Sequence, residues 1–286
     1  MDQAQGIRQM KSQKPVRVIA ITSGKGGVGK SNVTVNLAVS LAQLGEKVMV
    51  MDADMGLANI DVLLGLSPHM NLSHVISGEC TLEECIVEGP KGIKIIPASS
   101  GIAAMSDLTP AQNAGVIRSF SELTDPVDTL LIDTAAGLSD SVVSYTRAAR
   151  EVIVVVCDEP ASITDAYAMI KVMNRDYDVQ RFHVLSNQAQ DMQQGRDLFT
   201  KLNRVSQKYL DVTLDYLGAV PYDDCLKKAV QKQKTVVESY PRSPASLAFR
   251  QLAKKLHQWP VPKDMEGHLE FFIERLVSFS GQDNRL

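Results

Sequence analysis

The fold of this chain is decided near its N-terminus by the stretch Gly24-Lys25-Gly26-Gly27-Val28-Gly29-Lys30-Ser31. An apolar run at 16–21 precedes the stretch and predicts a strand, and a helical pattern at 33–44 follows it. Strand, glycine-rich loop and helix in this order are typical of a P-loop, in which backbone N–H groups and a helix N-terminus bind phosphate. The sequence therefore predicts a triphosphate site here. The alternative is a glycine loop that only turns a strand into a helix.

Each residue type in this loop has an expected role. Lys30 should reach the β- and γ-phosphates, and Ser31 should bind Mg²⁺. Lys25 is a second lysine at a position that the P-loop pattern leaves free. Its ammonium can lie at the phosphates or reach those of a facing subunit. The other expected nucleotide contacts from this region are Gly24, Gly26, Gly27, Val28, Gly29 and Asn32.

The composition is that of an ordinary globular protein. The chain has 286 residues, of which 44% are hydrophobic and 22% charged, with a net charge of −3. The charge gives no global sign of nucleic-acid binding. The four cysteines form no C-x-x-C pair, so we expect reduced thiols in a cytosolic chain. Because no apolar stretch approaches the length of a transmembrane helix, any membrane contact should be peripheral.

Apolar, β-branched runs alternate with helical patterns along most of the chain. Most of these runs are continuously apolar, which is typical of parallel strands buried on both faces. We expect strands at 17–22, 47–52, 93–97, 129–133, 151–157, 183–186 and 214–220. We expect helices at 30–44, 72–76, 82–86, 110–123, 139–149, 162–178, 195–212, 224–233 and 243–258, with Asn71 and Thr81 as N-caps. The prediction is one α/β domain, a doubly wound, mostly parallel sheet covered by helices on both faces.

The two ends of the chain differ from this domain in character. Residues 1–14 are polar and are expected to form an arm outside the core, and the domain spans 15–259. Pro260 and Pro262 end the last helix of the domain, and 260–267 form a short linker. Residues 268–286 are expected to form one more helix and a tail.

Carboxylates follow two of the predicted strands. Asp52 and Asp54, two residues apart, leave a strand end on the same side, next to the expected Mg-triphosphate. Asp52 is expected near the metal. Asp133 ends an apolar strand in the Walker B arrangement, in which the carboxylate holds Mg²⁺ through water. An Asp after a strand is also a common turn and N-cap residue.

Three further positions follow predicted strands. The side-chain amide of Asn187 both donates and accepts hydrogen bonds, which suits the edge of adenine. Pro221, in the loop 220–223, could flank the same base. Asp165 fits the first turn of a helix that begins with Ser162 as its cap.

The double-lysine loop resembles the deviant Walker A motif of the MinD/ParA family. The resemblance implies an ATPase that is a dimer with ATP, two nucleotides lying between the subunits, and a monomer with ADP or without nucleotide. It implies that Lys25 completes the partner's site and that Asp54 positions the attacking water. It also places Gly137 in the second switch, Asp165 at the dimer interface and Asn187 at the base. Lys25, Lys30 and Asp54 are thus the expected catalytic residues.

The expected C-terminal helix carries one apolar stripe. The stripe residues follow helical spacing and are Leu269, Phe272, Ile273, Leu276 and Phe279. Such a face can lie in a bilayer interface or dock into a groove of its own domain or of a partner. The rest of the helix, with Glu270 and Glu274, is acidic, so attraction to anionic lipid should be weak. The family's membrane-targeting helix favours a tail that is stowed in the monomer and freed in the ATP dimer.

The arm carries the run Asp2-Gln3-Ala4-Gln5-Gly6-Ile7-Arg8. It resembles the D-Q-A-x-x-L-R element of the FlhG/FleN group within the family, with Ile7 in place of Leu. That resemblance implies that Asp2, Gln3, Ala4, Ile7 and Arg8 stimulate the FlhF GTPase. It also implies restraint of a flagellar transcription activator (FlrA or FleQ), contact with flagellar C-ring components, and reversible association with the inner face of the membrane at a flagellated pole.

Three other functions remain open at this point. A ParA-like partition ATPase would bind DNA non-specifically and would need a basic dimer face. An iron–sulfur carrier would need correctly placed cysteines, whereas Cys157 has no neighbouring cysteine in the sequence. A scaffold would bind nucleotide with little turnover. The net charge and the tail helix favour the flagellar regulator, with no direct nucleic-acid partner.

Overall fold

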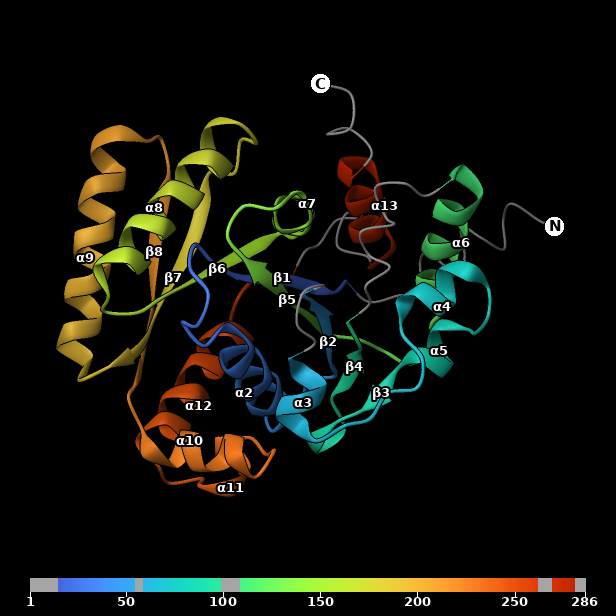
Figure 1. Cartoon of the computed structure of the whole chain (residues 1–286), viewed down its shortest axis with the longest axis horizontal. Helices are drawn as coiled ribbons and strands as arrows, with labels where there is room; N and C mark the ends of the chain where they lie inside the picture. Colours follow the sequence, from blue (N-terminus) through green and yellow to red (C-terminus); the bar gives the residue numbers. More distant parts are fainter. Residues whose placement is uncertain (1–14, 55–58, 99–108, 262–268, 281–286) are drawn as a thin grey trace.

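The computed structural model describes residues 15–54, 59–98, 109–261 and 269–280 (Figure 1). Its strands form a single eight-stranded sheet in the order β3-β4-β2-β5-β1-β6-β7-β8, in which only the β3–β4 pair is antiparallel. The strands are β1 Arg17–Ser23, β2 Val48–Ala53, β3 Val87–Glu88, β4 Lys94–Ile96, β5 Thr129–Ala136, β6 Glu151–Val156, β7 Arg181–Ala189 and β8 Thr213–Pro221. The predicted fold class is confirmed.

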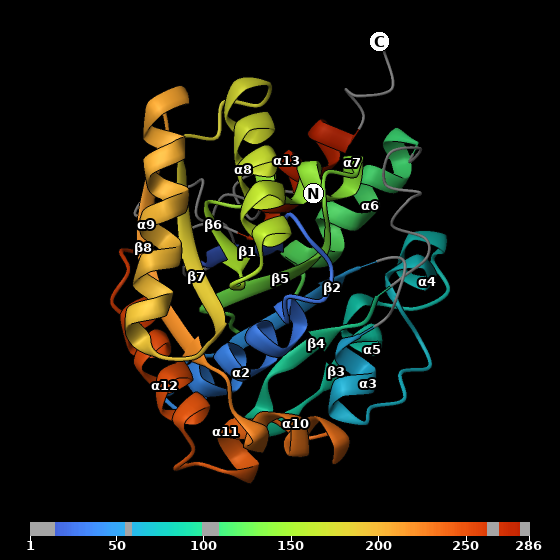
Figure 2. The same cartoon turned by 60° about the vertical axis from the view of Figure 1, so that its left-hand side comes forward.

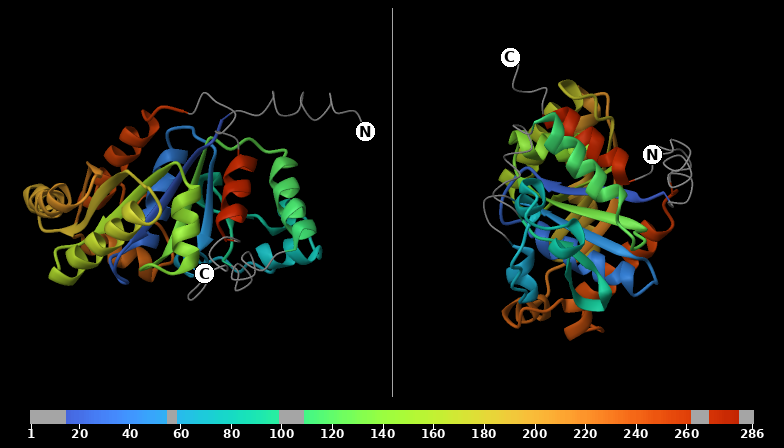
Figure 3. Two further views of the ribbon diagram at one scale, coloured as in Figure 1. Left: turned by 90° about the horizontal axis from the view of Figure 1, so that it is seen from above. Right: turned by 90° about the vertical axis from the view of Figure 1, so that its right-hand side faces the viewer.

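Helices cover both faces of the sheet (Figures 2 and 3). The helices are α2 Lys30–Ala42, α3 Ile60–Leu64, α4 Leu72–Ser77, α5 Leu82–Cys85, α6 Pro110–Ser121, α7 Asp140–Ala148, α8 Pro160–Arg175, α9 Met192–Tyr209, α10 Asp224–Gln231, α11 Val236–Ser239, α12 Pro244–His257, α13 Leu269–Ser280 and the 3₁₀ turn η1 Pro90–Gly92. Helices α2 and α12 pack on one face of the sheet, and α6, α7, α8, α9 and α13 pack on the other.

Strand periodicity explains the two cores. In β1, Ile19 and Ile21 point to the α2 face, while Val18 and Ala20 point to the opposite face, and all four are buried. Side chains of a strand alternate between faces, so an uninterrupted apolar run serves both cores at once. The continuous runs in the sequence therefore gave a correct prediction of a sheet covered on both sides.

The sequence analysis missed the shortest elements and misplaced the starts of α8 and of α9, which begins at Met192 and not at the expected residue 195. Strand β3 and helices α3 and α11 are two to five residues long and carry no clear periodicity. Helix α8 begins at Pro160, whereas the expected start was 162 with Ser162 as the cap. That expectation was wrong. Proline is well suited to the first turn of a helix, and the Ser162 hydroxyl instead accepts a hydrogen bond from the Cys157 N–H.

The predicted caps of two short helices are confirmed. Asn71 accepts from the Ser73 N–H and Thr81 accepts from the Glu84 N–H, each within a capping box. Caps of this kind satisfy N–H groups that have no partner inside the helix. They fix α4 and α5 under the edge of the sheet, where Leu72 and Leu82 are buried.

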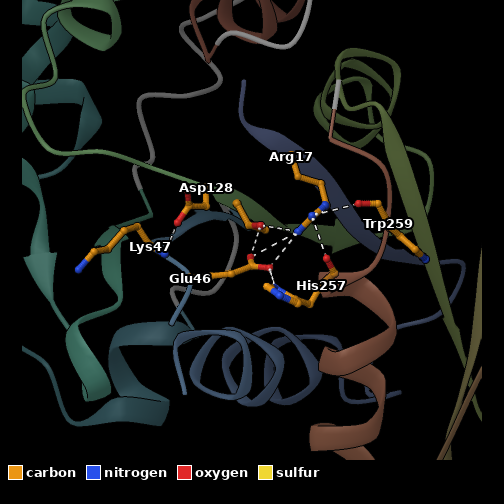
Figure 4. Close-up of polar contacts among 7 residues, drawn as sticks. Arg17, Glu46, Lys47, Asp128, His257 and Trp259 are labelled. Carbon is orange, nitrogen blue, oxygen red and sulfur yellow. Dashed lines mark hydrogen bonds and ion pairs between the residues drawn. The ribbon is translucent and has the colours of Figure 1, made fainter. Parts of the chain in front are cut away.

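A buried ion pair joins the start of β1 to the residues before β2, and hydrogen bonds tie it to the end of α12 (Figure 4). Arg17 Nη1 lies 3.2 Å from Glu46 Oε1, and both side chains are 6% exposed. Arg17 Nη2 donates to the carbonyl oxygens of His257 and Trp259, at 3.5 and 3.2 Å. Thr129 Oγ1 donates to the same Glu46 carboxylate at 2.6 Å. This cluster fixes the point at which the chain leaves the domain toward α13.

We expect Glu46→Ala to destabilise the protein by about 3 kcal/mol, because removing one partner leaves the other charge buried and unpaired. The matched control is Asp125→Ala, which breaks the ion pair between Asp125 and Lys94. The Asp125 side chain is 65% exposed. Exposed pairs contribute about 0–1 kcal/mol, so the control should unfold close to the wild type. Urea unfolding measures both free energies. Equal losses in the two variants would contradict this reading of the cluster.

Candidate functional site

The glycine loop lies between β1 and α2, at the carboxyl ends of the parallel strands. Ser23 Oγ donates to the Lys25 carbonyl at 2.7 Å and closes the first turn of the loop. Gly29 has φ +88°, a left-handed conformation that favours glycine, and a Cβ there would lie 2.5 Å from Asn187 Nδ2. The side chain of Lys30 starts α2 and is buried. Loop, helix N-terminus and lysine thus form the phosphate cradle that the sequence predicts.

The pairing of β2 with β5 sets Asp52 opposite Asp133 beside this loop. Thr34 Oγ1 donates to Asp133 Oδ1 at 3.0 Å, a contact that the sequence analysis did not anticipate. Asp133 Oδ2 is buried and has no hydrogen-bond partner among the described residues. Burial raises the pKa of Asp133 to about 7, while Ser31, Lys30 and Thr34 oppose the rise. An unsatisfied carboxylate oxygen next to the Ser31 hydroxyl fits a Mg²⁺ site.

Asp52 has a different set of contacts. Its Oδ1 accepts from the Asp54 N–H, and its Oδ2 accepts from the N–H groups of Asn59 and Ile60, at 3.1 to 3.2 Å. Burial raises its pKa to about 6. Both oxygens therefore tie the ends of the 54–60 loop to β2, and the metal role expected of Asp52 stays a prediction. Asp54 itself lies at the start of this loop and accepts from Asn59 Nδ2 at 3.3 Å.

These raised pKa values predict a pH dependence of stability. In the unfolded chain both carboxyls have ordinary, lower pKa values, so their contribution to stability is fully present below about pH 4 and is lost progressively as pH rises through the folded pKa values of about 6 and 7. Without nucleotide, the stability of Asp133→Asn relative to wild type should rise by on the order of 1 kcal/mol or more between about pH 4, where the folded and unfolded carboxyl are both protonated, and pH 8. Unfolding midpoints from pH 4 to 8 test this. A difference that does not change with pH would contradict it.

A small pocket opens on the far side of the loop from Asp133. Asn187 borders it and donates from Nδ2 to the Val28 carbonyl at 2.8 Å, so the amide is fixed against the loop. The pocket is lined by Gly29, Asn32, Asn187, Gln188, Pro221, Tyr222, Asp223, Leu226 and Lys227. The structure thus brings the predicted base contacts Asn187 and Pro221 together with Asn32, a predicted nucleotide contact. Leu226 and Lys227 were not predicted, because they lie in α10, beyond the end of β8 on which the prediction was based.

Lys25 forms an ion pair within its own chain. Its ammonium pairs with the carboxylate of Glu159, the residue before α8, and this hydrogen bond raises the pKa of Lys25. Gly24 packs against the first turns of α8, because a Cβ there would lie 2.2 Å from the carbonyl carbon of Asp165. The loop is thus in contact with the helix that carries the expected interface residue. Glu159 was missed, although its place after an apolar strand was a usable signal.

The apolar stripe of α13 is packed on the domain, between α6 and α7. Ile273 and Leu276 are at most 1% exposed, and Phe279 is partly buried. We expected Glu270 and Glu274 on an acidic face away from the stripe. Glu274 is exposed, but Glu270 is only 8% exposed, so the expectation was wrong for Glu270. Within the described residues, none of the helices has the length and apolar character to cross a bilayer. The predicted arm residues, Asp2, Gln3, Ala4, Ile7 and Arg8, lie outside the described residues.

Comparison with known proteins decides the family. A family model described as the ParA "NUBPL iron-transfer P-loop NTPase" matches residues 14–257. The antiactivator FleN of Pseudomonas aeruginosa is 57% identical over 95% of this chain and 97% of its own length. The chain belongs to the ParA/MinD family of P-loop ATPases. The flagellum site-determining protein YlxH of Helicobacter pylori, 34% identical over 93% of this chain and 91% of its own, supports the FlhG/FleN resemblance.

Solved structures agree with this family. The MinC:MinD complex of Aquifex aeolicus matches with a TM-score of 0.66 and 26% identity over 87% of this chain and 98% of that one. MinD of Pyrococcus horikoshii, solved with Mg-ADP, matches with a TM-score of 0.65 and 26% identity over 85% of this chain and 96% of that one. Nucleotide and Mg²⁺ binding therefore occur in the family, and the cradle and the open oxygen of Asp133 suit both.

Proposed function

We propose that this ATPase limits the number and sets the place of flagella, acting as a dimer that forms only with ATP. The observation that carries the proposal is the 57% identity to the antiactivator FleN over nearly the whole chain, together with the double-lysine P-loop. Low similarity across a shared fold would not support a specific role, since one fold serves many functions. Here the similarity covers 95% of the chain.

In the proposed site, Lys30 and the loop N–H groups hold the β- and γ-phosphates, and Asn187 and Pro221 hold the adenine. Ser31 and Asp133 would hold Mg²⁺, which neutralises charge on the phosphates when bound. Asp54 orients the attacking water. Phosphoryl transfer needs mainly positioning and charge stabilisation. The side chains around the phosphates come from the ends of three neighbouring strands, β1, β2 and β5.

Dimerisation completes the site in this proposal. Lys25 leaves Glu159 and reaches the nucleotide of the facing subunit, while Asp165 lies at the subunit interface. Support comes from the contact of Gly24 with the Asp165 backbone and from the ion pair of Lys25 with Glu159, both of which join the loop to the start of α8. With ADP, or without nucleotide, Lys25 returns to Glu159 and the chain is a monomer.

The proposed tail function is reversible attachment to the inner face of the cell membrane, at the flagellated pole. Leu269, Phe272, Ile273, Leu276 and Phe279 are packed on α6 and α7 in this structure. The same apolar face would lie in a bilayer interface once freed, since burial in lipid replaces burial in the domain. Because no strong basic face accompanies the stripe, attachment should rely on apolar burial and on two tails per dimer.

The proposed partners are FlhF, the transcription activator FlrA or FleQ, and C-ring components. The name of the relative, antiactivator, supports restraint of an activator. The arm residues Asp2, Gln3, Ala4, Ile7 and Arg8 are proposed to stimulate GTP hydrolysis by FlhF.

Deleting residues 1–10 tests the arm. We expect FlhF GTP hydrolysis, measured with saturating ATPase, to fall to its unstimulated rate, while ATP hydrolysis by the truncated chain itself is unchanged. A matched control is Gln5→Ala, which changes a position that the D-Q-A-x-x-L-R pattern leaves free. Full stimulation of FlhF by the truncated chain would refute the arm proposal.

DNA binding is the second candidate function, and one observation favours it. The segment 224–258, which includes α10, α11 and α12, carries eight basic residues against the two acids Asp224 and Glu238. They are Lys227, Lys228, Lys232, Lys234, Arg242, Arg250, Lys254 and Lys255. Retention of the ATP dimer on random-sequence DNA, lost steeply between 50 and 200 mM salt as roughly expected for phosphate contacts, would establish this function. No retention at low salt would exclude it.

A further inference from the structure

One arginine links the tail helix to two helices of the domain. The guanidinium of Arg147, near the end of α7, lies 4.0 Å from the ring centroid of Phe279 in α13. It also lies 4.8 Å from the ring centroid of Tyr177, just past the end of α8. Arg275 of α13 donates from Nη2 to the Arg147 carbonyl at 2.8 Å. We call Arg147, Tyr177, Arg275 and Phe279 the Arg147 clasp.

Both domain helices that meet at the clasp start beside the nucleotide site (Figure 2). Helix α7 follows β5 and Gly137, whose N–H donates to the Ser23 carbonyl at the start of the P-loop. Helix α8 follows Glu159, the ion-pair partner of Lys25. Arg147 is the eighth of the nine residues of α7, and Tyr177 follows all sixteen residues of α8, so most of each helix lies between the nucleotide end and the clasp. A helix is stiff over such lengths, so a shift at one end appears at the other.

The clasp is sensitive to the relative position of α7 and α8. Arg147 moves with α7, whereas Tyr177 moves with the end of α8. A cation is attracted to a ring face only within about 6 Å of its centroid. Loss of a partly buried contact of this kind changes the equilibrium between packed and released α13 about tenfold. A displacement of a few ångströms between the helices therefore removes one of the two ring contacts and shifts α13 toward release from the domain by about that factor.

We propose that Arg147 is the residue through which α7 and α8 hold the tail helix on the domain, and that relative movement of these two helices opens the clasp and frees α13. The inference rests on the proposed function, because it names how the nucleotide site would control the tail. Arg147 acts on the tail as a positioning residue and touches no nucleotide.

Hydrogen exchange of the α13 backbone amides tests the clasp without any lipid. In the ADP-bound full-length protein, Arg147→Ala should exchange about tenfold faster at α13 than wild type, and Arg147→Lys should lie between them. The matched control is Arg118→Ala. Arg118 lies on α6, on the other side of α13, and its exposed guanidinium pairs with Glu122 at 2.7 Å. It should leave α13 exchange unchanged.

Exchange at α13 that is the same in Arg147→Ala, Arg118→Ala and wild type would overturn the inference. If Arg147→Ala lowers the unfolding midpoint of the whole domain, Tyr177→Leu tests the same clasp from α8, and unchanged exchange in that variant overturns it equally. Vesicle sedimentation is a separate readout: wild type that never binds vesicles with ATP rejects the membrane proposal, whereas the exchange result still judges the clasp.

Discussion

Replacing Lys30 by alanine should lower ATP hydrolysis by a factor of about 100 or more and abolish ATP-driven dimerisation. The Lys30 side chain is buried at the start of α2, and its charge acts on Asp133 next to it. Without it, the β- and γ-phosphates lose the cation that offsets their charge in the bound and transition states, a loss of about 3 kcal/mol or more. Phosphate release assays and nucleotide titration measure the two effects.

Lys25→Ala is the matched variant, because Lys25 sits in the same loop but its ammonium is exposed and paired with Glu159. This variant should bind ATP with nearly wild-type affinity, remain monomeric and hydrolyse ATP at a rate close to that of Lys30→Ala. If Lys25→Ala dimerised and turned over ATP like wild type, the second lysine would have no role across the interface.

Leu276→Glu should reduce ATP-dependent binding to vesicles by a factor of roughly 10 to 100. The side chain is 1% exposed in the packed tail and lies in the middle of the apolar stripe. Full burial of a leucine is worth about 1.5–3 kcal/mol, and burying a carboxylate adds a further cost, so the variant loses affinity for the lipid interface. Sedimentation with vesicles of neutral and anionic lipid, with ATP and with ADP, gives the comparison.

Ser278→Ala is the control on the exposed side of α13, where the Ser278 hydroxyl donates only to the Glu274 carbonyl of the same helix. Its vesicle binding should stay within a factor of two of wild type, and ATP hydrolysis should persist in both variants. Wild-type vesicle binding by Leu276→Glu would show that the stripe serves only to pack against α6 and α7.

The long strands and helices and the centre of the site could be predicted from the sequence. Each has a periodic pattern of apolar residues or a fixed position after a strand. The continuous apolar run of β1 predicts a strand buried on both faces, and the glycines of the P-loop mark the turn that follows it. Strand ends gather at one edge of a parallel sheet, so Asp133 and Asn187 were expected beside the loop, where they lie.

The rest depends on contacts between segments that are far apart in the sequence. Thr34 is one helical turn past Lys30, and only the packing of α2 on β5 brings its hydroxyl to Asp133. In the sequence Arg147 has no distinguishing feature. Only the fold brings the rings of Tyr177 and Phe279 next to its guanidinium. The buried Arg17–Glu46 pair likewise joins residues with no shared motif. Such pairings depend on tertiary packing, which a periodic pattern does not encode.

The central claim is that ATP joins two copies of this chain, and its most direct measurement is the mass of Asp54→Ala in solution with saturating Mg-ATP and with Mg-ADP. Removing the carboxylate that we propose to position the water should trap the ATP state. Sedimentation equilibrium should then give twice the chain mass of 31.3 kDa with ATP and the single mass with ADP. A single mass in both nucleotides, or the doubled mass in both, would contradict the account.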